Sequence, residues 1–192
     1  MFLQDQAQRR FGEPLVRVHG RVRVLKGAIN TKNIHRTNAL LGHPWGTGFE
    51  YDERMLTGDG PKGERRARNM ARMARIQNAL LGCAPTRALL RRFALPKPGE
   101  GPNKRARDNG RYELLFIGET ARRKRLRASV TGDRDPGYGS TSKMIAESAL
   151  CLIGDPDRSM IGGGVWTPGS AMGMTLARRL EERAGMRFAI EE

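Results

Sequence analysis

The strongest local constraints on the fold lie in residues 132–173, where turn and helix-boundary residues are concentrated. The tripeptide DPG at 135–137 is a turn sequence, because proline presets φ and glycine tolerates positive φ. Ser140 and Thr141 follow as candidate helix N-caps. The next apolar residues recur at helical spacing and predict one apolar helix face. That face comprises Met144, Ala149, Leu150 and Ile153.

A second helix start follows a short loop. The glycine run 162–164 leads into Thr167 and Pro168, a pair typical of a helix N-cap and first helical position. The predicted helix 168–184 ends at Gly185, the residue type that most often stops a helix. The whole stretch therefore predicts a turn, a helix, a glycine-rich loop and a second helix.

The rest of the chain supplies strands grouped with helices, without regular alternation of the two. The further predicted helices are 2–11, 31–41, 62–81 and 85–93. The predicted strands are 15–25, 49–55, 111–119, 124–133 and 186–190, and the third and fourth of these form a hairpin. The Pro- and Gly-rich residues 95–110 are predicted as a loop or arm. This pattern predicts an α+β fold with a mixed, largely antiparallel sheet covered by helices on one face.

Basic residues outnumber acidic ones by 35 to 20, giving a formal net charge of +15. Such a charge is typical of binding to nucleic acid or an anionic membrane, but arginine-rich coding also produces it. No nucleic-acid-binding motif is present, which disfavours nucleic acid as a partner. On the predicted helix 62–81, arginines at 65, 68, 72 and 75 share one face, opposite Met70 and Met73. The arginine face is either simply solvated, or the helix lies on an anionic membrane surface.

Several other functional classes find no support. Cys83 and Cys151 have no metal-ligand spacing, so we expect no metal site and a buried free thiol at each, as in a reducing, cytoplasmic compartment. The GxGxxG match at 58–63 follows a charged strand, contains Pro61 and lacks the later acidic residue of a dinucleotide site. It predicts a flexible glycine loop. No signal peptide and no apolar run of membrane-spanning length is present.

Motifs spread over nearly the whole chain resemble one known family. They are HRTNALLG (35–42), the FEYDE strand, LPKPGEGP (95–102), GDRDPGYGSTSKM (132–144) with ESALCL, and GGGVWTP (162–168) with AMG. In this order and at this spacing they resemble the C-terminal half of the saccharopine dehydrogenase-like oxidoreductases. The most similar subgroup is the one that includes the trans-acting enoyl reductases.

The resemblance implies an NAD(P)-linked oxidoreductase whose C-terminal α+β domain covers the cleft and often dimerises. Residues 1–192 would then be a single substrate or dimerisation domain without its Rossmann domain, with an internal deletion near 27–28. NAD(P) is expected for the full-length family and not for this chain alone, which we expect to be inactive. The implied partner is a second copy or the missing Rossmann domain. The expected location is cytoplasmic, with peripheral membrane contact through 62–81 as the alternative.

Five residues of the 132–173 stretch are candidates for binding substrate: Asp135, Tyr138, Lys143, Gly163 and Gly164. The Asp135 carboxylate orients a ligand or caps its own turn. The Tyr138 phenol donates a proton or packs against substrate. Lys143 meets an anion at a helix start or pairs with Glu147 four residues on. The two glycines permit close approach of a ligand or of another helix. No catalytic residue and no cofactor-binding residue is assigned.

Overall fold

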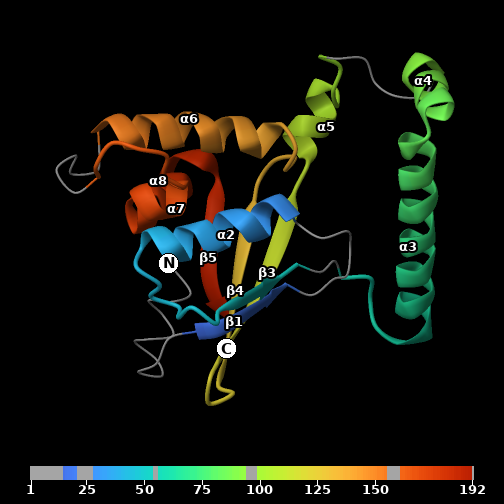
Figure 1. Ribbon diagram of the computed structural model, residues 1–192. Coiled ribbons are helices and arrows are strands. Elements are labelled where there is room, and N and C mark those ends of the chain that lie inside the picture. Colours follow the sequence, from blue (N-terminus) through green and yellow to red (C-terminus); the bar gives the residue numbers. More distant parts are fainter. Residues whose placement is uncertain (1–14, 21–27, 54–55, 94–98, 155–160, 192) are drawn as a thin grey trace.

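A computed structural model describes residues 15–20, 28–53, 56–93, 99–154 and 161–191 (Figure 1). Its strands form one five-stranded sheet in the order β2-β1-β3-β4-β5. The strands are β1 (Leu15–Gly20), β2 (Glu50–Asp52), β3 (Tyr112–Thr120), β4 (Arg125–Gly132) and β5 (Met186–Glu191). β1 pairs in parallel with β2, and the other three pairings are antiparallel. The predicted mixed, largely antiparallel sheet is therefore confirmed.

Seven helices of the described residues alternate irregularly with these strands along the chain (Figure 1). They are α2 (Ala28–Leu40), α3 (Gly60–Gly82), α4 (Ala84–Phe93), α5 (Lys104–Asn109), α6 (Gly139–Gly154), α7 (Pro168–Ala171) and α8 (Gly173–Ala184). The predicted helix 2–11 and the join at 27 lie outside the described residues. Among the described residues, no helix combines the length and the apolar character that crossing a bilayer requires.

The core forms on one face of the sheet. Alternate residues of β4, namely Leu126, Ala128 and Val130, are buried, and side chains on alternate strand positions share a face. Val130 belongs to a cluster with residues of α6, α8 and β5, whereas Leu126 packs with Trp45. Phe116 of β3 packs against both clusters. Arg125 and Arg127, on the other face of β4, are exposed, which agrees with the prediction that helices cover one face, although Ser129 on that other face is buried as well.

Two predicted boundaries are wrong. Residues 95–110 are not entirely a loop, because α5 forms within them and the Asn103 side chain accepts a hydrogen bond from the Ala106 N–H at its start. The predicted helix 168–184 is broken into α7 and α8 at Met172, and Gly173 has a positive φ of 48°. The predicted cap at Thr167 is confirmed as a capping box with Ser170.

The helix α6 also differs from its prediction. Ser140 and Thr141 lie inside the helix, which begins at Gly139. Its inward face contains Ser140, half-buried Met144 and Cys151. The predicted apolar face is wrong, because Leu150 and Ile153 point to solvent with Ile145, which is 70% exposed. The outer face of α6, which we define as Ile145, Ala146, Ala149, Leu152 and Ile153, is therefore apolar and uncovered.

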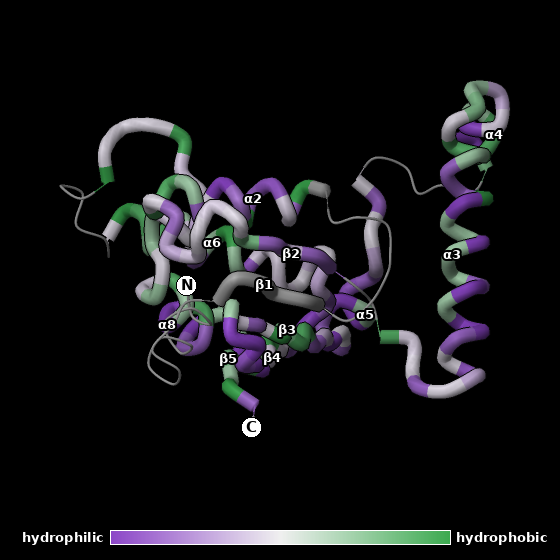
Figure 2. The backbone as a smooth tube through the Cα atoms, turned by 60° about the horizontal axis from the view of Figure 1, so that its bottom comes forward, coloured by the Kyte–Doolittle hydropathy of each residue, from purple (hydrophilic) through white to green (hydrophobic). Residues whose placement is uncertain are grey.

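Helices α3 and α4 form an arm, residues 60–93, at one side of the molecule (Figures 1 and 2). Only Gly63 is buried among the arm's residues. Cys83, between the two helices, is exposed, so the expected burial of both thiols is wrong for Cys83 and right for Cys151. The arm thus contributes nothing to either core cluster.

We predict that Leu126→Ala destabilises the chain by about 2–5 kcal/mol, because Leu126 is 1% exposed and its removal leaves a cavity between β4 and Trp45. Chemical denaturation followed by circular dichroism measures the change. Leu89→Ala in the arm is the matched control, since Leu89 is exposed, and it changes the free energy of unfolding by no more than about 0.5 kcal/mol. Equal effects of the two variants would contradict this location of the core.

Candidate functional site

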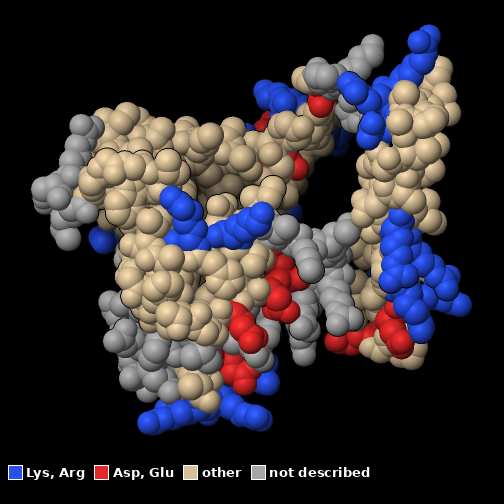
Figure 3. Space-filling view, viewed as in Figure 1, with Lys and Arg blue, Asp and Glu red and all other residues tan. Residues whose placement is uncertain are grey.

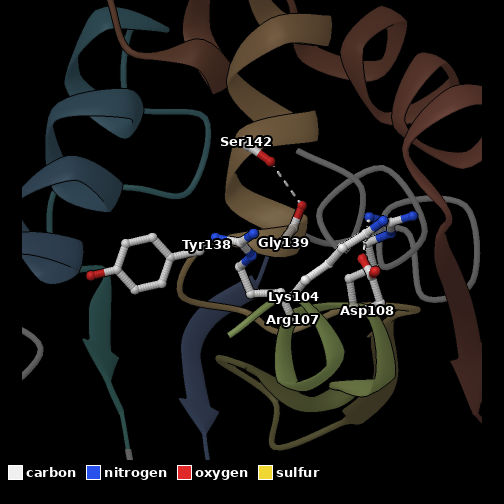
Figure 4. A pocket seen from close by; sticks show the side chains of 7 residues that line it. Lys104, Arg107, Asp108, Tyr138, Gly139 and Ser142 are labelled. Atoms are coloured by element: carbon white, nitrogen blue, oxygen red, sulfur yellow. Dashed lines mark hydrogen bonds and ion pairs between the residues drawn. The ribbon is translucent and has the colours of Figure 1, made fainter. Parts of the chain in front are cut away.

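A surface pocket of about 420 Å³ lies where α5 meets the start of α6 (Figure 4). It is lined by Lys104, Arg107, Asp108, Arg134, Tyr138, Gly139 and Ser142. Three of these side chains are cationic and one is anionic, so the lining carries a net positive charge. A concave surface with convergent charged groups is the usual form of a small-ligand site.

The 133–139 turn gives the pocket one of its walls. The Asp135 carboxylate accepts hydrogen bonds from the backbone N–H groups of Tyr138, at 2.7 Å, and Gly139, at 3.3 Å. Its backbone carbonyl accepts a third from Ser140. Asp135 therefore holds the start of α6, as an Asx turn does, and this structural use accounts for its hydrogen bonds without a ligand.

The electrostatics of Asp135 follow from the same contacts. The hydrogen bond from the Tyr138 N–H is the main cause that holds the pKa of Asp135 below its ordinary value of 3.8, against a smaller opposing effect of desolvation. Hydrogen bonds from Gly139 and Gly137 and the positive charge of Arg107 add to the lowering. The carboxylate is therefore ionised at neutral pH and contributes negative charge next to the pocket.

The helix α5 approaches the turn so closely that Gly110 has no room for a side chain and Gly139 has little. A Cβ at Gly110 would lie 2.5 Å from the Asp135 Cα, and a Cβ at Gly139 would lie 3.0 Å from the Arg107 carbonyl oxygen. The Asp135 N–H donates to that same Arg107 carbonyl at 3.0 Å. Across the contact, Arg134 and Asp108 form an ion pair with an N–O distance of 2.8 Å. These contacts fix the two walls of the pocket relative to each other.

Of the predicted site residues, Tyr138 lines the pocket and Lys143 does not. The Tyr138 ring packs against Gly101, where an added Cβ would lie 3.2 Å away, and its hydroxyl points away from the charged side chains in Figure 4. The Lys143 ammonium instead binds Asp133 at 3.1 Å and the Ala184 carbonyl at 3.3 Å. The anion that it meets at the helix start is thus a carboxylate of the chain itself.

The alternative pairing of Lys143 with Glu147 is wrong, because the Glu147 carboxylate binds the Arg179 guanidinium of α8 at 2.7 Å. Gly163 and Gly164 follow the C-terminal end of α6, whereas the pocket lies at its N-terminal end (Figure 1). Both glycines are exposed. The structure therefore does not bring them together with Tyr138.

The pocket's cationic residues were missed by sequence reasoning. Lys104 and Arg107 lie in α5, within the segment predicted as a loop. An available signal was Asn103, a good N-cap residue directly before a run of helix-forming residues. Nothing in the sequence indicates that Arg134 and Arg107 converge, since their approach depends on the tertiary contact through Gly110 and Gly139.

The lining residues suit the binding of an anionic group. Guanidinium and ammonium groups bind phosphate and carboxylate through charge-assisted hydrogen bonds, whereas the Ser142 hydroxyl at the same wall already donates its hydrogen bond to the Gly139 carbonyl at 3.0 Å. Among the described residues, no group of three or more His, Cys, Asp or Glu side chains is placed to hold a metal ion.

An α+β fold with a basic pocket between α5 and α6 defines the class of the protein only broadly. Comparison with known proteins gives a more specific class. The chain is 33% identical over 168 residues to a trans-acting enoyl reductase of Mycobacterium ulcerans, covering 82% of this chain and 38% of the relative. It is 32% identical over 160 residues to a trans-acting enoyl reductase of Mycobacterium tuberculosis, covering 81% and 38%. A second M. tuberculosis protein, which carries the same name provisionally, is 35% identical over 162 residues, covering 79% and 36%.

The chain is therefore homologous to a segment of proteins named trans-acting enoyl reductases, and it spans just over a third of the length of these curated relatives. This agrees with the subgroup that the motifs resemble. No family model matches the chain, and no solved structure matches it.

We predict that Asp135→Asn makes the stability of the chain less dependent on pH. Because the folded state lowers the pKa of Asp135, ionised Asp135 stabilises the fold above the pKa of the unfolded chain, and this stabilisation is lost as pH falls through the lowered value. The advantage of the wild type over the variant should therefore shrink on acidification.

Urea unfolding at a series of pH values, from neutral to below the ordinary pKa of aspartate, measures this difference. Asp59→Asn, which removes an equal charge at the exposed start of α3, is the control. A difference between wild type and Asp135→Asn that stays constant over the acid range would contradict the role of Asp135 as an ionised cap.

Proposed function

We propose that the chain forms the substrate-side part of an enoyl reductase-type oxidoreductase of the saccharopine dehydrogenase-like group. The similarity to trans-acting enoyl reductases over about 80% of the chain carries this proposal. Reduction of an enoyl double bond requires a hydride donor, which in this proposal is NADPH or NADH bound by a nucleotide-binding domain outside this chain. The chain alone shapes the substrate site and does not turn over.

The pocket between α5 and α6 is the proposed place for the anionic part of the substrate. Lys104, Arg107 and Arg134 give it a net positive lining, which suits a phosphate group of an acyl carrier better than an apolar acyl chain. Ser142 lines the pocket and lies one helical turn from Ala146 on the outer face of α6. An apolar acyl chain whose anionic end occupies the pocket would therefore meet apolar side chains along α6.

Tyr138 is the proposed substrate-contact residue of this site. Its ring is 54% exposed at the pocket's edge, held in place by contact with Gly101. Asp135 acts as a positioning residue in this proposal, since its carboxylate fixes the Tyr138 backbone. Lys143 contributes by anchoring α6 to Asp133, next to the same turn. Gly163 and Gly164 have no part in the pocket.

A binding measurement tests the proposal. We predict that a medium-chain enoyl-coenzyme A binds the chain in isothermal titration calorimetry, and that the double variant Lys104→Ala/Arg107→Ala weakens binding at least about tenfold. Each substitution removes a charge-assisted hydrogen bond worth roughly 1.5–3 kcal/mol. Arg105→Ala is the matched control, because Arg105 belongs to the same helix and does not line the pocket.

Two outcomes would contradict the proposal. Equal losses from the double variant and from Arg105→Ala would assign the binding to general positive charge. Oxidation of NADPH by the isolated chain in the presence of the enoyl thioester, followed at the nicotinamide absorbance band, would show that the cofactor site lies within this chain.

The outer face of α6 is the proposed contact with the nucleotide-binding domain. It is apolar, uncovered and continuous with the pocket through Ser142, and a contiguous exposed apolar patch is typical of an interaction site. Closure of a second domain over this face would turn the open pocket into a cleft shielded from water, as hydride transfer requires.

We predict that the isolated chain sediments as a monomer over a wide concentration range, because in this proposal the outer face of α6 binds a nucleotide-binding domain and not a second copy of the chain. Sedimentation velocity measures the mass. A dimer that Ile145→Glu/Ile153→Glu dissociates would assign the face to a second copy of the chain instead. Leu89→Glu/Phe93→Glu, on the exposed apolar side of the arm, is the control for unspecific hydrophobic association.

A further inference from the structure

The arm of α3 and α4 is the largest part of the described chain that neither core cluster nor the pocket uses. Its 23-residue helix α3 and 10-residue helix α4 contact each other and bury no side chain. In proteins most of the stability of a helix comes from packing of its apolar face rather than from intrinsic propensity, and the arm buries no side chain. The exposed surface of the arm is therefore a candidate binding surface.

The arm is strongly basic. Its basic residues are Lys62, Arg65, Arg66, Arg68, Arg72, Arg75, Arg87, Arg91 and Arg92, and Glu64 is its one acidic residue. Figure 3 shows the Lys and Arg side chains gathered on the side of α3 that faces away from the sheet. Glu64 pairs with Arg68 at 3.1 Å, four residues on, which leaves the excess positive charge of the arm almost unchanged.

The arm is apolar as well as basic. In α3, Met73 is 64% exposed, and Ile76 is exposed in the next turn. In α4, Leu89 and Phe93 share one face, and Phe93 is 73% exposed. The Arg92 guanidinium lies 5.5 Å from the Phe93 ring centroid, so a cation and an aromatic ring stand side by side at the end of the arm.

We propose that the arm binds the surface of an anionic phospholipid membrane, with α3 and α4 lying in the interface. An anionic bilayer accommodates both features of the arm at once. Its headgroups attract the arginines, and its acyl boundary accepts the apolar side chains between them. The long arginine side chains can extend toward the headgroups while their stems cover apolar surface.

Duplex DNA fits the arm less well. It would neutralise the arginines, but contacts to its phosphate groups would leave Met73, Leu89 and Phe93 in water. The arm lies on the membrane rather than across it, because five arginines between positions 65 and 75 of α3 would be too costly to place inside the bilayer. Membrane contact would hold the pocket of the same chain close to a lipid surface, where long acyl compounds partition.

Vesicle binding tests the proposal. We expect the 192-residue chain to co-sediment with vesicles of phosphatidylglycerol and phosphatidylcholine at physiological salt, and not with phosphatidylcholine alone. Arg72→Glu/Arg75→Glu should lower the partition coefficient at least about tenfold, since each basic residue near an anionic surface contributes about a factor of five. Leu89→Gln/Phe93→Gln should also lower it about tenfold, through loss of the inserted apolar surface.

A matched control separates the effect of the charge on the arm from the effect of the net charge of the chain on vesicle binding. Arg178→Glu/Arg187→Glu changes the net charge by the same amount at exposed positions of α8 and β5 and should leave binding within about twofold. Circular dichroism checks that each variant keeps its fold. The proposal is overturned if the control variant weakens binding as much as the arm variants do. It is also overturned if Leu89→Gln/Phe93→Gln has no effect while the chain binds duplex DNA more tightly than vesicles.

Discussion

The antiparallel pairing of β3 with β4 is the constraint on which the rest of the structure depends. It holds Phe116 opposite Ala128 and Leu114 opposite Val130, and the buried apolar side chains of β4, Leu126, Ala128 and Val130, share one face of the sheet. It also fixes Gly132, the last residue of β4, directly beside the Tyr112 ring. The Tyr112 hydroxyl then bonds Ser140 of α6 at 2.9 Å. The start of α6, and with it the pocket, is thus placed by the end of the hairpin.

Much of the fold was predictable because local signals and tertiary structure agree along most of the chain. The hairpin, the capping box at Thr167 and the left-handed Gly185 all occur where the sequence indicates them. The orientation of α6 was not predictable, because both of its faces are apolar enough to be buried. The orientation that forms places Met144 and Cys151 inward and Ile145 and Ile153 outward, and it is accompanied by two tertiary ion pairs, Glu147 with Arg179 and Lys143 with Asp133.

Of the candidate site, only the 133–139 turn was predictable from the sequence. The DPG sequence indicated that Asp135 caps its own backbone, and its bonds to Tyr138 and Gly139 do this. Two of the three cationic side chains that line the pocket, Lys104 and Arg107, come from α5, which lies well before the turn in the chain. Their approach depends on a backbone contact between Gly110 and Asp135 closer than any side chain would allow. A pair of glycines far apart in sequence carries no local signal of such contact, so only the folded chain reveals the basic pocket.

Two apolar surfaces remain uncovered in the described chain, and their charges distinguish what each can bind. On α6 the two charged side chains, Lys143 and Glu147, both point toward the protein and are paired there, so the outer face offers apolar contact alone, as an interface between protein domains does. On the arm, apolar residues occur in the same helices, α3 and α4, as an excess of arginines, a combination that a protein interior would bury only at high cost. The outer face of α6 therefore suits contact with a protein domain that closes the pocket. The arm suits an anionic membrane, whose headgroups are charged and whose interior is apolar.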